Sequence, residues 1–175
     1  LEFSGSHVLQ VAVPALADAL RQYNPHIAVF RNQLRELPEP REILPIAAPV
    51  TVFFGALHRQ DDWQDIMPVL NGAARHYGAR LHFKVVADKA FFASLATPYK
   101  AFIGRPSYYA GDLVPYAVYE KELHTADIAL LPLHDTSYNR LKSDLKFIEA
   151  AGHGAAVLAS PTVYAASIDD EIGRA

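Results

Sequence analysis

Short apolar runs alternate with amphipathic segments along most of this chain, and the alternation limits the folds open to it. The run TVFFGAL at 51–57 is too short for a helix and is bounded by turn residues, as expected of a strand buried on both faces. Parallel strands need crossover connections, which are usually helices. The order therefore predicts an α/β fold, in which a parallel sheet carries helices on both faces. The predicted strands are 8–13, 26–30, 51–57, 81–87, 101–104, 127–133 and 155–160.

Helix boundary signals accompany these strands. Pro14 stands at a first helical position, and Asp61 or Asp62 can cap the next long helix. Pro68 should kink that helix or mark a later start, and Gly78 follows its end. The predicted helices are 14–23, 61–77, 89–95, 114–124, 143–151 and a short one from 162.

Composition excludes several classes of protein. With 175 residues, 51% of them hydrophobic, the chain is long enough to bury a core. Its 16 basic and 19 acidic residues give a net charge of -3, which argues against nucleic acid as a partner, so any phosphate binding must be local. The absence of cysteine removes disulfides, thiolate metal sites and cysteine nucleophiles from consideration.

The sequence contains no transmembrane segment, because no stretch reaches the roughly 18 apolar residues that a spanning helix needs. The expected compartment is the cytoplasm, and a longer parent protein could make peripheral membrane contact. The first residues, LEFSGS, have no evident pattern and are read as partly vector-derived. Residues 31–49 are rich in proline and charge, so we interpret them as a linker with a boundary near residue 45.

The segment with the most candidate ligand-binding residues follows the strand DIALLPL at 127–133. The loop HDTSYNRLKS leads into a helix that we expect Ser143 to cap, so free backbone amides and Lys142 would favour a phosphate there. Lys142 and Lys146 are like charges one turn apart, a spacing that an anion between them would stabilise. Glu149 could accept hydrogen bonds from two vicinal ribose hydroxyls. These residues predict a nucleotide-sugar pocket.

A simpler interpretation of the same residues stays open. Lys142, Lys146 and Glu149 could form a solvated helix face that contains a pair between Lys146 and Glu149. Spacing alone does not separate this alternative from a ligand pocket.

The segment resembles the donor-binding motif of group 1 glycosyltransferases of the GT-B fold. The resemblance lies in the aspartate and apolar strand from Asp127, the Lys-Ser pair, the Lys-x-x-Glu helix, Gly154 and the strand at 155–160. It implies that the sheet is a Rossmann-like half of a GT-B protein. It also implies that Glu149 contacts the nucleotide ribose and that the preceding loop contacts the diphosphate. The loop residues concerned are Asn139, Lys142 and Ser143.

Two other loops share in the resemblance. FFGALHRQDDW stands where the family places a glycine turn and basic residues near the donor phosphates, which implies roles for Gly55, His58 and Arg59. Gly55 could equally make a tight exit from its strand. IGRPSYY stands where the nucleobase pocket forms, which implies contacts from Arg105 and Pro106.

The N-terminal segment PALADALRQYNPHIAVFRNQL is similar to the last unit of the family's acceptor-side domain. The resemblance therefore implies that residues 1–44 are the end of that domain with its linker, and that residues 45–175 are a donor-binding domain, incomplete at its C-terminus. The missing N-terminal GT-B domain would be a partner. Many members carry two glutamates in the motif, and Leu141 stands where the first would lie, so no catalytic residue is assigned.

The function implied is transfer of a sugar from a nucleoside diphosphate sugar to an unknown acceptor, as in polysaccharide biosynthesis. We expect no cofactor and no metal, because the eight histidines are scattered without a metal-binding spacing. The chain also lacks the Gly-x-Ser-x-Gly, Walker and Gly-x-Gly-x-x-Gly motifs. A sugar-nucleotide epimerase of the same fold and a non-catalytic interaction module remain alternatives.

Overall fold

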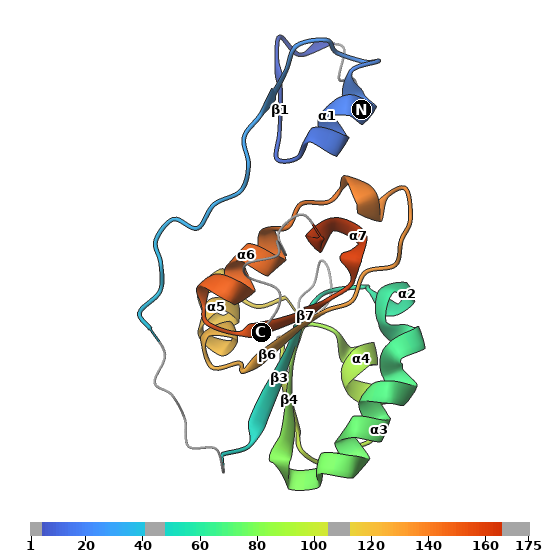
Figure 1. The fold of residues 1–175 in the computed structure, drawn as a ribbon, viewed down its shortest axis with the longest axis vertical. Helices are drawn as coiled ribbons and strands as arrows, with labels where there is room; N and C mark the ends of the chain where they lie inside the picture. Colours follow the sequence, from blue (N-terminus) through green and yellow to red (C-terminus); the bar gives the residue numbers. More distant parts are fainter. Residues whose placement is uncertain (1–4, 41–47, 105–112, 166–175) are drawn as a thin grey trace.

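The computed structural model describes residues 5–40, 48–104 and 113–165 and contains two parallel sheets (Figure 1). The small sheet pairs β1 (Leu9–Val11) with β2 (Ile27–Val29). The large sheet has five strands in the order β5-β4-β3-β6-β7. Its strands are β3 (Val50–Gly55), β4 (Leu81–Val86), β5 (Lys100–Ile103), β6 (Ile128–Leu131) and β7 (Ala156–Ala159). The α/β prediction is confirmed, and the predicted strands within these ranges all form.

The order of the large sheet is that of a Rossmann-like fold. The chain starts in the centre at β3, moves outward through β4 and β5, and then returns to pair β6 with the other side of β3. At this reversal in strand order, the loop after β3 turns toward one face of the sheet and the loop after β6 turns toward the other. A crevice forms between the two loops at the carboxyl ends of the strands. Ligands of open α/β sheets bind at such a place.

Helices cover both faces of the large sheet, as the alternation predicts. One face carries α2, α3 and α4, and the other carries α5 and α6 (Figure 1). The short α7 follows β7, and α1 connects the two strands of the small sheet. The bounds are α1 (Pro14–Leu20), α2 (Gln60–Trp63), α3 (Met67–Tyr77), α4 (Lys89–Ser94), α5 (Tyr116–His124), α6 (Leu145–Gly152) and α7 (Pro161–Tyr164).

The two faces have different cores. On the α2–α4 side, the Phe54 and Phe91 rings stack with centroids 3.9 Å apart, and Trp63 meets Phe91 edge-on at 5.3 Å. On the other side the core holds several buried alanines, so α5 and α6 can pack close to the sheet. These alanines are Ala126, Ala129, Ala150 and Ala155.

The long helix predicted after β3 is broken. It begins at Gln60, before both aspartates, and a 3₁₀ turn at Gln64–Ile66 separates α2 from α3. The prediction that Asp61 or Asp62 caps it is therefore wrong, since both lie in its first turn. Pro68 lies in the first turn of α3, where its missing N–H costs no hydrogen bond, so the later start is confirmed. Gly78 follows α3 with φ of 53°, as expected of a C-terminal glycine.

Asp127, just before β6, links the amino ends of β3, β6 and β7 by hydrogen bonds. Its Oδ2 accepts a hydrogen bond from Thr51 N at 2.7 Å, its N–H donates to Thr51 O at 2.9 Å, and its carbonyl accepts from Ala156 N at 2.8 Å. The first residue of the glycosyltransferase-like motif thus lies at the end of the sheet opposite the crevice.

The predicted boundary near residue 45 falls within 41–47, outside the described residues. Within the described ranges, no helix combines the length and hydropathy of a membrane span.

Gly55, the last residue of β3, is required by packing. A Cβ built there would lie 2.6 Å from Tyr119 Cε2 and 2.9 Å from the Phe53 ring, and both rings lie in the α5 side of the core. The position therefore excludes any larger side chain without displacement of Tyr119 or Phe53.

We expect Gly55→Ala to lower the free energy of unfolding by about 1–3 kcal/mol, because the methyl group overpacks the junction of β3 and α5. Urea denaturation measures the loss. Gly72→Ala is the matched control: a Cβ at this position in α3 would meet no neighbouring side chain within 4 Å, so the substitution should stabilise the protein by up to about 1 kcal/mol. Equal stability of Gly55→Ala and the wild type would contradict this account of the junction.

Candidate functional site

Two cavities open at the carboxyl end of β3, the first beside the end of β6 and the second beside the end of β4. The first, called here the polar cavity, has a volume of about 390 Å³ and contains four of the predicted site residues: His58, Arg59, Asn139 and Lys142. Other residues complete its wall: Leu57, Asp61, Asp62, His134, Thr136 and Tyr138.

The second, called here the apolar cavity, has a volume of about 430 Å³ and contains three more of the predicted residues: Gly55, Lys146 and Glu149. Aliphatic and aromatic side chains form most of the rest of its wall, and Leu57 lines both cavities. The structure thus brings seven predicted site residues, which are far apart in sequence, to one edge of the sheet. Arg105 and Pro106 lie outside the described residues.

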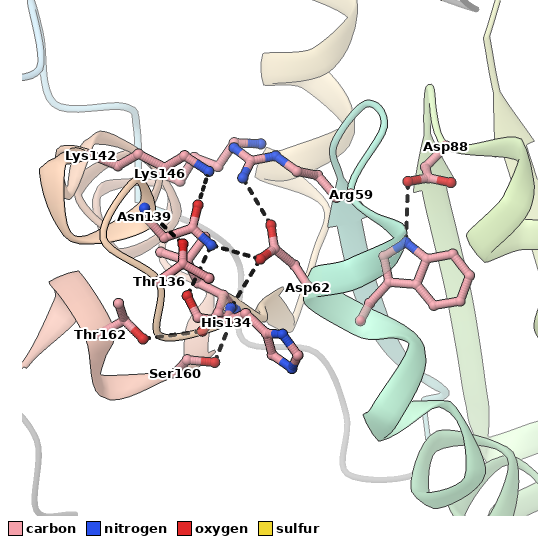
Figure 2. Close-up of polar contacts among 12 residues, drawn as sticks. Arg59, Asp62, Asp88, His134, Thr136, Asn139, Lys142, Lys146, Ser160 and Thr162 are labelled. Atoms are coloured by element: carbon pink, nitrogen blue, oxygen red, sulfur yellow. Dashed lines mark hydrogen bonds and ion pairs between the residues drawn. The ribbon is translucent and has the colours of Figure 1, made fainter.

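Asp62 joins the loops that form the polar cavity (Figure 2). Its Oδ1 accepts hydrogen bonds from His134 N and Asn139 Nδ2, both at 2.9 Å, and its Oδ2 accepts one from Arg59 Nη1 at 2.9 Å. Burial alone would raise the pKa of this carboxyl, but these hydrogen bonds and the Arg59 charge hold it below the usual value. Asp62 therefore stays ionised and fixes both loops.

Asn139 is buried and uses its side chain within the protein. Its Nδ2 donates to Asp62 and, at 2.9 Å, to His134 O, while its Oδ1 accepts a hydrogen bond from Lys142 Nζ. The direct contact with a diphosphate implied for Asn139 remains a prediction. Its visible role is to hold Lys142 against the polar cavity.

Three cationic side chains, Arg59, Lys142 and Lys146, extend toward one another (Figure 2). Burial and the nearby Arg59 charge lower the pKa of Lys142. Burial, the Arg59 charge and the Lys142 charge lower the pKa of Lys146 to about 8, against the opposing effect of Glu149. Because each charge disfavours the others, an anion placed among them would stabilise all three.

Lys146 lies between the two cavities. Its Nζ donates a hydrogen bond to Gly55 O at the end of β3, and it lies 5.7 Å from the centre of the Tyr119 ring. The ammonium therefore borders the apolar cavity while its charge acts on Lys142 and Arg59.

The solvated-face alternative is wrong for Glu149. Its side chain lies inward on α6, only 7% of the residue is exposed, and Oε1 accepts a hydrogen bond from the Tyr116 hydroxyl at 3.0 Å. A carboxylate is rarely buried without a partner or a ligand-related role. Glu149 therefore marks the floor of the apolar cavity.

The prediction that Ser143 caps α6 is also wrong. Asp144 occupies the N-cap, and its carbonyl accepts hydrogen bonds from Phe147 N at 2.9 Å and Ile148 N at 3.1 Å. The 3₁₀ turn Asn139–Leu141 and the extended Lys142 delay the helix by one residue. Because Asp144 puts a carboxylate at this helix end, anion recognition must depend mainly on the side-chain cations.

The sequence interpretation did not assign Asp62, His134 or Tyr116 to the site. His134 Nε2 lies 3.1 Å from Asp65 Oδ2, at the rim of the polar cavity. His134 could have been identified from the sequence, because it follows β6 by three positions and so lies at the edge of the sheet where ligands of α/β proteins bind. Asp62 and Tyr116 carried no such signal, because their contacts join segments distant in sequence.

The loop after β3 has an unusual backbone. His58 is exposed and has φ of 52°, and Ala87, which follows β4, has φ of 69°. Such conformations are rare for non-glycine residues and cluster at functional sites. They add to the reasons for placing a site at this edge of the sheet.

In the described part of the chain, no three histidine or acidic side chains gather as a metal-ion site would require.

No protein-family model matches this chain, and a search of curated proteins finds no significant similarity. The function is therefore inferred from the geometry of the two cavities and the motif residues that line them.

The low pKa of Lys146 predicts a pH-dependent stability. Its ordinary value is 10.5 and its folded value is about 8, so between these pH values the unfolded chain holds a proton that the folded protein has lost. The free energy of unfolding of the wild type should then rise with pH, relative to Lys146→Met, by about 1 kcal/mol per pH unit between roughly pH 8.5 and 9.5.

Urea denaturation at several pH values measures this difference. Lys121→Met is the matched control, because Lys121 is exposed on α5 and its removal should leave the pH dependence unchanged. A difference between wild type and Lys146→Met that stays constant over this pH range would show that the folded protein keeps Lys146 protonated.

Proposed function

We propose that this chain is the donor-binding part of a glycosyltransferase and holds a nucleoside diphosphate sugar across the carboxyl ends of β3 and β6. The observation that carries the proposal is the pairing of the two cavities, which share Leu57. One is apolar with a buried carboxylate, and the other is polar and holds Arg59 and Lys142. A nucleoside diphosphate has the same two halves, an apolar base with a ribose and a polyanion.

The nucleoside would lie in the apolar cavity. Val86, Val114 and Leu57 offer apolar contacts for a base, and Glu149 offers carboxylate oxygens to the ribose hydroxyls. The ribose supplies two adjacent hydroxyl donors to one carboxylate whichever base the nucleoside carries. Burial of Glu149 would make those hydrogen bonds strong.

The diphosphate would lie beside Lys146 and extend toward Lys142 and Arg59. Its negative charge would offset the mutual repulsion that lowers the pKa of both lysines. Ligand binding should therefore raise these pKa values toward the ordinary value for lysine.

The same cations would support transfer. When an acceptor hydroxyl oxygen bonds to the sugar C1, the bond from C1 to the diphosphate oxygen breaks, and its electron pair leaves with the nucleoside diphosphate. The diphosphate becomes more negative in this step, so cations fixed beside it stabilise the transition state more than the bound substrate. The acceptor proton must pass to a base that the described residues do not identify.

Calorimetry with UDP, GDP and the matching nucleosides tests the donor site. We expect micromolar binding of one diphosphate, and a loss of at least about tenfold on Lys142→Met or Arg59→Met, because each removes a charge from the diphosphate. The same variants should change binding of the nucleoside much less. Lys121→Met keeps the cavity intact and should bind like the wild type.

No measurable binding of either diphosphate would overturn the proposal. Binding that depends on Lys142 but comes without transfer by a longer form of the protein would favour a non-catalytic nucleotide-binding module instead. Rapid transfer by this chain alone would remove the expectation of a second domain.

A further inference from the structure

Tyr116 and Glu149 make a contact that donor binding alone does not explain. The Tyr116 hydroxyl donates to Glu149 Oε1 at 3.0 Å, and both residues line the apolar cavity. Burial and the neighbouring Glu149 carboxylate raise the pKa of Tyr116 to about 12, so the phenol remains a proton donor at neutral pH.

The contact engages one of the two oxygens of the Glu149 carboxylate. A vicinal diol that binds to a carboxylate in bidentate fashion donates one hydroxyl to each oxygen. With the phenol on Oε1, a ribose hydroxyl that approaches this oxygen from the cavity must compete with Tyr116, whereas Oε2 is open to the other hydroxyl. The protein therefore already has a hydroxyl of its own where one ribose hydroxyl would bind.

Glu149 and Tyr116 differ in how tightly their side chains are packed. Glu149 lies in the middle of α6 and is 7% exposed, next to the fully packed Ala150. Tyr116 is the first residue of α5 and is 56% exposed, and its ring centre lies 6.0 Å from that of Tyr119. A rotation of the Tyr116 side chain would disturb few contacts, whereas a movement of Glu149 would disturb the core.

We propose that the Tyr116 hydroxyl is a placeholder for a ribose hydroxyl on Glu149, and that the ribose displaces it when a nucleotide binds. This inference rests on the donor site proposed above. Tyr116 is then a specificity-determining residue. Its hydroxyl keeps the buried carboxylate hydrogen-bonded in the free protein. Binding of a ribose is weaker by the strength of this hydrogen bond, because the ribose must replace it.

Tyr116→Phe should therefore bind nucleotide more tightly than the wild type. The phenylalanine retains the ring but leaves Glu149 without its donor, and the ribose then supplies a hydrogen bond that was missing rather than one already made. With UDP or GDP, whichever binds the wild type more tightly, calorimetry should show a gain of about tenfold. The 2′,3′-dideoxy form of the same nucleotide has no diol and should bind both proteins equally.

Repeating the Tyr116→Phe substitution in a Glu149 variant shows whether Tyr116 acts through Glu149. In Glu149→Leu the Tyr116→Phe substitution should give no gain, because the oxygens for which both hydroxyls compete are gone. Tyr77→Phe is the matched control: Tyr77 is 52% exposed at the end of α3, outside both cavities, and its substitution should leave affinity unchanged.

Weaker or unchanged binding by Tyr116→Phe, with the wild type binding nucleotide, overturns the placeholder alone and leaves the donor site standing. An equal gain for the dideoxy nucleotide also overturns it, because the effect would then lie in contacts with the base. Absence of nucleotide binding by the wild type overturns both proposals together. Thermal unfolding of each variant confirms that it is folded before its affinity is compared.

Discussion

The three hydrogen bonds to Asp62 are the constraint on which the candidate site depends. They join Arg59, which precedes α2, to the loop between β6 and α6, although 72 residues separate Asp62 from His134. Through Asn139 the same carboxylate sets the position of Lys142. One buried anion thereby holds two of the three cations in place before any ligand arrives. Such preorganisation lowers the cost of binding, because the loops need not be ordered by the ligand.

Most of the fold could be predicted from the sequence, because apolar runs and helix boundary signals are local properties of the chain. Pro14, Pro68 and Gly78 mark the helix boundaries where their backbone chemistry predicts. The errors at Asp62 and Ser143 have different causes. Each was treated as a helix cap, but Asp62 bonds to a distant loop, and a 3₁₀ turn displaced the start of α6 by one residue.

The site was only partly accessible. The positions of Lys142, Lys146 and Glu149 after β6 could be predicted, because parallel strands end at a common edge. Their solvent exposure could not, since the burial of Glu149 and the burial that lowers the pKa of Lys146 arise from packing against other segments of the chain. Sequence spacing specifies which residues meet at an edge, whereas solvent access decides what chemistry they can perform.

The small residues between the sheet and α6 have a consequence for the shape of the apolar cavity. Ala150 is 1% exposed and is the neighbour of Glu149 in α6, so its methyl group sets how far that helix stands from the strands. A larger side chain there would push α6 outward and carry Lys146 and Glu149 with it. The width of the apolar cavity can therefore be altered from inside the core, by a residue that does not line it.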